Sequence, residues 1–130
     1  MDVNYLAVIA AAVSAFFLGG LWYSPMMFLN PWNAAMGRTA ASKNGHPAKV
    51  FGLSFLFALI AAAAFAHVIG PQPELRDALH MALIVGLAFV TMCFGINYQF
   101  ADRPITAMLI DGGYHTMQFV LYAVILGLWH

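Results

Sequence analysis

The sequence predicts an all-α integral membrane protein: a bundle of four transmembrane helices with a short interfacial helix in the first loop. Hydrophobic residues fill 63% of the 130 positions and charged residues only 8%, which is more apolar surface than a water-soluble domain of this size buries. Four apolar stretches approach the ~20 residues that a helix needs to cross a bilayer. We therefore expect one membrane domain over 1–130, with spans at about 3–23, 50–70, 78–98 and 105–129.

Charge and cysteine content exclude several classes of protein. Five basic and five acidic residues give a net charge of zero, so the chain has no electrostatic surface for nucleic acid and its expected partner is the lipid bilayer. Cys93 is the one cysteine, which rules out an intrachain disulfide and a thiolate zinc cluster. It lies in an apolar run and is expected to be inert core.

The first span, 3–23, contains no Lys or Arg. The missing basic start and the length of the apolar run favour a retained helix over a cleaved signal peptide. Small residues recur at every fourth position of this span and of the second span, and Gly112 lies in the fourth. Such stripes let helices approach closely. The expected packing residues are Ala7, Ala11, Ala15, Gly19, Ala58, Ala62, Ala66 and Gly112.

The loop after the first span begins with apolar residues and then becomes polar. Asn30 followed by Pro31 is typical of a helix start, and Gly37 of a helix stop. We expect a short interfacial helix from Pro31 to Met36, with Trp32 at the level of the lipid headgroups.

Basic residues predict the orientation of the spans, because Lys and Arg resist translocation. The loops 24–49 and 99–104 hold Arg38, Lys43, Lys49 and Arg103, whereas the loop between the second and third spans holds only Arg76. The first and third loops are therefore expected in the cytoplasm and both termini outside.

The fourth span carries a polar stripe. At ~100° per residue, four side chains share one helix face: Asp111, His115, Gln118 and Tyr122. An ionised carboxylate inside the bilayer costs about 3 kcal/mol on insertion scales, so Asp111 must be paired, hydrated or protonated. His115, one turn away, is the nearest candidate partner. The others are Asn97, Trp22 and Tyr23.

Three functional readings of these residues remain open. In the first, the stripe is an interhelical hydrogen-bond junction in a structural or interaction subunit, with surplus small-residue stripes covered by a second copy or another membrane protein. In the second, Asp111 and His115 form the path of a proton-coupled or small-solute transporter. In the third, His67 and His80, at the facing ends of the second and third spans, hold haem or a metal. The third has weak support, because no metal-ligand spacing and no catalytic motif is visible. We therefore expect neither a metal nor a cofactor; the missing catalytic motif argues against an enzyme, and the sequence does not decide that question.

Two segments resemble a known family. They are Gly20 to Pro25, which reads Gly-Leu-Trp-Tyr-Ser-Pro, and Asp111 to His115, which reads Asp-Gly-Gly-Tyr-His and is followed by Gly127-Leu128-Trp129 at the end of the same span. The chain is similar to the small bacterial membrane proteins of domain-of-unknown-function family 1761. The resemblance implies a four-helix protein of the bacterial inner membrane and assigns no activity.

Overall fold

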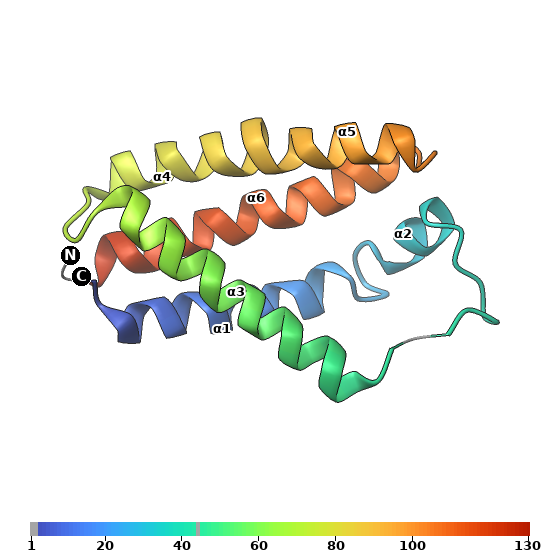
Figure 1. The fold of residues 1–130 in the computed structure, drawn as a ribbon, viewed down its shortest axis with the longest axis horizontal. Coiled ribbons are helices and arrows are strands. Elements are labelled where there is room, and N and C mark those ends of the chain that lie inside the picture. Colours follow the sequence, from blue (N-terminus) through green and yellow to red (C-terminus); the bar gives the residue numbers. More distant parts are fainter. Residues whose placement is uncertain (1–2, 44) are drawn as a thin grey trace.

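The regular structure is helical throughout. The computed structural model describes residues 3–43 and 45–130, and this part of the chain contains no strand. Four long segments run back and forth along one axis, so that both ends of the chain lie at the same end of the bundle (Figure 1). They are α1 (Tyr5–Trp22), α3 (Pro47–Ile69), a continuous segment Leu75–Phe100 and α6 (Ile105–Leu128).

Local capping sets the ends of α1 and α3. The side chain of Asn4 caps α1 by accepting a hydrogen bond from a backbone amide of the first turn. α3 begins three residues earlier than predicted, because His46 caps it by accepting from the Ala48 amide at 3.2 Å and Pro47 suits the first turn. Gly70, with φ of +88°, ends α3 in a backbone conformation that favours glycine.

A short helix is present where the interfacial helix was predicted, but it begins earlier than predicted. α2 (Leu29–Ala35) begins two residues before Pro31, and its N-cap is Phe28, which makes no side-chain cap hydrogen bond. Asn30 therefore lies inside the helix and does not cap it. The predicted stop is confirmed, since Gly37 has φ of +70° directly after the C-cap.

The third long segment is not α-helical throughout. It consists of α4 (Leu75–Leu83), the π-helical η1 (Ile84–Thr91) and α5 (Met92–Phe100). In η1 the Thr91 hydroxyl donates to the carbonyl of Gly86, five residues earlier, at 2.6 Å. The sequence did not predict this wider turn, although π-helical turns are known to interrupt α-helices.

α6 is the central helix and contacts every other helix of the bundle. It packs most closely on η1, where two glycines remove the side chains that would collide. A Cβ on Gly86 would lie 2.6 Å from Thr116 Cα, and a Cβ on Gly112 would overlap the side chain of Thr91. Elsewhere alanines fill the core, since Ala7, Ala11, Ala15, Ala62, Ala78, Ala82 and Ala123 are all fully buried.

Within the part of the chain that the structure describes, three segments are long and apolar enough to cross a membrane: α1, α3 and Leu75–Phe100. The sequence predicted four spans. α6 has 24 residues but falls outside this group, because Asp111, His115 and Gln118 lower its hydropathy. A membrane protein is thus supported, and the fourth crossing requires a separate argument.

Candidate functional site

Asp111 is held by two tyrosines from two other elements. Its side chain, on α6, is only 6% exposed. Tyr23, at the end of α1, donates its hydroxyl to Oδ1 at 2.5 Å, and Tyr98, on α5, donates to Oδ2 at 2.5 Å. Two hydroxyl donors facing two oxygens is the arrangement that satisfies an ionised carboxylate, and bonds of this kind are short. We call Asp111, Tyr23 and Tyr98 the carboxylate clamp.

Neighbouring side chains fasten the same end of α1 to α6. The Trp22 indole Nε1 donates to the carbonyl of Ile110 at 3.0 Å. Tyr114 donates its hydroxyl to the carbonyl of Ala15 at 2.9 Å. Their acceptors are main-chain carbonyls, so these two bonds hold α1 against α6 independently of the charge on Asp111.

A second group of polar side chains begins at His115. Its Nδ1 lies 2.6 Å from Gln118 Oε1, Gln118 Nε2 donates to the Tyr122 hydroxyl at 2.7 Å, and that hydroxyl donates to the Ala58 carbonyl of α3 at 3.0 Å. Tyr122 is fully buried and Gln118 is 5% exposed. We call His115, Gln118, Tyr122 and the Ala58 carbonyl the histidine chain.

Aromatic rings hold the imidazole of His115 in place. The Phe94 ring stacks on it with 5.3 Å between ring centroids and 16° between planes. The Tyr114 ring meets it edge-on at 4.8 Å. A histidine fixed on two sides has little freedom to rotate.

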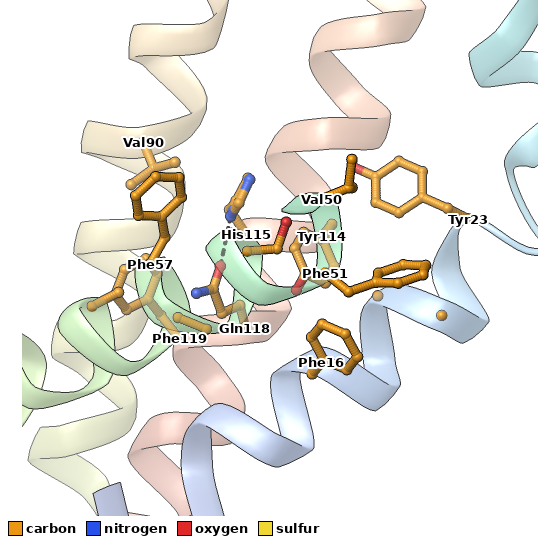
Figure 2. A pocket seen from close by; sticks show the side chains of 15 residues that line it. Phe16, Tyr23, Val50, Phe51, Phe57, Val90, Tyr114, His115, Gln118 and Phe119 are labelled. Carbon is orange, nitrogen blue, oxygen red and sulfur yellow. Dashed lines mark hydrogen bonds between the residues drawn. The ribbon is translucent and has the colours of Figure 1, made fainter. Parts of the chain in front are cut away.

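A cavity of about 680 Å³ lies beside His115, between α1, α3 and α6. Figure 2 shows His115 and Gln118 on its wall, surrounded by aromatic and aliphatic side chains. It exists because α3 crosses α1 obliquely and its first half leans away from α6 (Figure 1). Phe51 and Phe57 of α3 line it and are 59% and 62% exposed, so its rim reaches the apolar outer surface.

The structure separates two residues that the sequence had paired. His115 does not bond Asp111; each belongs to its own group, although both lie on α6. Tyr23 was among the expected partners and is one, whereas Asn97 is exposed and lines a shallow surface hollow with Cys93. Cys93 itself is exposed and is not core.

Sequence reasoning missed Tyr98 as the second clamp donor, and also Thr91 and Thr116 at the η1 contact. Tyr98 lies three residues before the tight turn at 101–104 and Asp111 seven residues after it, so the two differ in depth by about one helical turn, ~6 Å, which a tyrosine side chain can span. That register is the signal that could have found it. Thr91 and Thr116 gave none, because hydroxyl groups are common in membrane helices.

The sequence offered His67 and His80 as weak metal candidates. His67 Nδ1 lies 2.8 Å from the Ala63 carbonyl of its own helix, a bond that uses one ring nitrogen. Across residues 3–43 and 45–130, no group of three or more His, Cys, Asp or Glu side chains is placed to hold a metal ion. The haem reading of His67 and His80 needs only two imidazoles, so this finding does not test it and it stays a prediction.

The fold and the site define a class: a helical membrane bundle with a buried carboxylate at one helix contact and a mainly apolar side cavity that a histidine reaches. The model of the family Protein of unknown function (DUF1761) matches residues 6–127, and the chain belongs to that family. The resemblance of the two sequence segments is thereby confirmed. Comparison with curated proteins and with solved structures gives no match.

Proposed function

We propose that this protein crosses the bacterial inner membrane four times and holds a lipid-soluble small molecule in the cavity between α1, α3 and α6. The observation that carries the proposal is the cavity itself. Its volume of about 680 Å³ is in the range of small-molecule sites, which are typically apolar with a few polar groups of fixed direction. His115 and Gln118 are such groups, since hydrogen bonds and ring contacts hold both.

The burial pattern of α6 supports the fourth crossing. Its 24 residues rise about 36 Å, enough for a ~30 Å hydrocarbon core. Asp111 and Gln118 point into the bundle and are buried, whereas Leu109 and Leu128 are exposed. Charged and polar residues in membrane helices typically face the bundle interior in this way.

The distribution of basic residues supports the orientation. α2 and the loop 101–104 lie at the same end, where Arg103 Nη1 donates to the carbonyl of Met36 at 2.6 Å. Arg38 and Lys43 lie in the loop at that end and Lys49 in the first turn of α3 beside it, whereas Arg76 lies in the first turn of α4 at the opposite end. The positive-inside rule then favours α2 on the cytoplasmic side of the membrane and both termini on the outside.

The alternative readings have less support. The homo-oligomer was motivated by surplus small-residue stripes, but Ala11, Ala15 and Ala62 are already fully buried within one chain. A transport path along α6 would need a connected polar stripe, whereas Asp111 and His115 belong to separate hydrogen-bonded groups. The carboxylate clamp is better explained as an interhelical junction.

The experiment fills the cavity without disturbing the fold. Gly20 lines the cavity, and a Cβ added there meets no atom within 4 Å, so Gly20→Leu places a side chain in open space. Gly52→Leu is the matched control, since Gly52 also has open space but does not line the cavity. The probe is 4-hexylanisole in phospholipid nanodiscs, followed by the methyl resonances of Val50 and Val90. We expect saturable shifts in the wild type and Gly52→Leu and none in Gly20→Leu. Absent shifts in the wild type, or equal shifts in all three proteins, contradict cavity binding.

A further inference from the structure

We infer that the cavity selects a neutral alcohol or phenol, because the histidine chain leaves Nε2 of His115 as a hydrogen-bond acceptor on the cavity wall. This inference rests on the proposed binding of a lipid-soluble molecule and names the chemical class of that molecule. It follows from the donor and acceptor roles in the hydrogen bonds of the histidine chain, which are all determined once one group in the chain has a fixed role.

The fixed point is the main-chain carbonyl of Ala58, which can only accept. The Tyr122 hydroxyl, 3.0 Å away, must therefore donate to it and has no second hydrogen for Gln118. Gln118 must then turn its NH₂ group toward Tyr122 and its oxygen toward His115. Because Gln118 Oε1 also only accepts, Nδ1 of His115 must carry the hydrogen.

The opposite direction is excluded by the same groups. If Gln118 were turned around, its oxygen would face Tyr122 and its NH₂ group would face Nδ1. The single hydroxyl hydrogen of Tyr122 would then face two acceptors, the Ala58 carbonyl and Gln118 Oε1. It could bond only one of them, so the other contact would bring two oxygen acceptors together with no hydrogen between them. Tyr122 is fully buried, so no solvent relieves that conflict.

A neutral imidazole with its hydrogen on Nδ1 has a lone pair on Nε2. Among the described residues no carboxylate bonds the ring to stabilise its charged form, since Asp111, one turn away on α6, bonds Tyr23 and Tyr98 and His115 bonds only Gln118. Figure 2 shows the second ring nitrogen of His115 on the side away from Gln118. Nε2 has no hydrogen-bond partner among residues 3–43 and 45–130.

The other polar groups around the cavity agree with a hydroxyl ligand. Tyr23 and Tyr114 also line the cavity, but their hydroxyls already donate to Asp111 and to the Ala15 carbonyl. Ser54 of α3 also lines it, and in the described chain its hydroxyl has no partner. A ligand hydroxyl can thus donate to Nε2 of His115, whereas a cationic or anionic ligand would find no charged side chain on the cavity wall.

The first test reads the tautomer and needs no ligand. Long-range ¹H–¹⁵N correlation spectra of ¹⁵N-histidine-labelled protein in nanodiscs distinguish a hydrogen on Nδ1 from one on Nε2. We expect the Nδ1–H form for His115, and a shift toward the Nε2–H form in Tyr122→Phe, because loss of the fixed donor lets Gln118 turn. Tyr114→Phe is the control, since it removes a hydroxyl from the residue next to His115 that does not belong to the histidine chain. An Nε2–H form in the wild type overturns the inference.

The second test compares 4-hexylphenol with 4-hexylanisole, which differ in the hydroxyl donor and have similar apolar bodies. One hydrogen bond to a wall acceptor should make the phenol bind about tenfold more tightly to the wild type. His115→Phe keeps a ring to stack on Phe94 and should abolish this preference while the anisole still binds. Equal affinities in the wild type overturn the inference and leave the proposed cavity binding intact. Failure of both probes to bind contradicts the proposed function itself.

Discussion

Removing a hydroxyl from the carboxylate clamp tests whether Asp111 carries a charge in the folded protein. We consider Tyr23→Phe and Tyr98→Phe, each of which leaves one carboxylate oxygen without its donor. A hydrogen bond to a charged group contributes about 1.5–3 kcal/mol, whereas neutral interhelical bonds in membranes average about 0.6 kcal/mol. Asp111 is 6% exposed, so solvent does not replace the lost donor. We therefore expect each variant to lose about 2 kcal/mol of unfolding free energy.

Tyr114→Phe supplies the neutral comparison. Tyr114 also joins α6 to α1 through one hydroxyl bond, but its acceptor is the Ala15 carbonyl. We expect this variant to lose about 0.6 kcal/mol. In an Asp111→Asn background the cost of Tyr23→Phe should fall to a similar value, because the acceptor is then an amide.

The assay is reversible unfolding in mixed detergent–lipid micelles, followed by circular dichroism and tryptophan fluorescence. Equal losses for Tyr23→Phe, Tyr98→Phe and Tyr114→Phe, near 0.6 kcal/mol each, would refute the charged clamp. A cost for Tyr23→Phe that Asp111→Asn leaves unchanged would refute it as well.

Three further predictions concern packing and loops. Gly112→Ala should lower the free energy of unfolding by about 1–3 kcal/mol in the same assay, because the added Cβ overlaps Thr91. Gly52→Ala has open space around its Cβ and should be neutral or slightly stabilising. Equal effects of the two variants would contradict the close contact between α6 and η1. Thr91→Val should speed amide hydrogen exchange in residues 84–91, since it removes the hydroxyl bond inside η1, and unchanged exchange would show that this bond does not hold the wider turn. Arg103→Met should increase protease cleavage in residues 37–46 by loosening the two loops from each other, and cleavage equal to the wild type would argue against that role.

Composition and turn residues were enough to predict the helical bundle. Polar loops with proline separate the apolar segments, and the effect of these residues on the backbone is local. The long helices and the end of the short helix at Gly37 could therefore be predicted from the sequence. The errors have local causes too. His46 caps α3, but its position in a polar loop had suggested a solvated side chain. α2 starts at the apolar residue before Asn30 and not at Pro31.

The site was less predictable because it depends on contacts between helices. Helical spacing put Asp111 and His115 on one face but gave no information about which neighbour faces each of them. Tyr98 reaches Asp111 from α5, and Ala58 fixes the histidine chain from α3, so both depend on the packing of distant segments. The cavity depends on the tilt of α3, which no local pattern encodes.

The measurement that tests the central claim most directly is the location of bound 4-hexylphenol in nanodiscs, read from intermolecular nuclear Overhauser effects. We predict contacts from the phenol ring to His115 and to the methyl groups of Val50 and Val90, all of which line the cavity. Contacts confined to outward-facing side chains such as Leu109 and Leu128 would show that the molecule stays in the surrounding lipid, and would contradict a binding site beside His115.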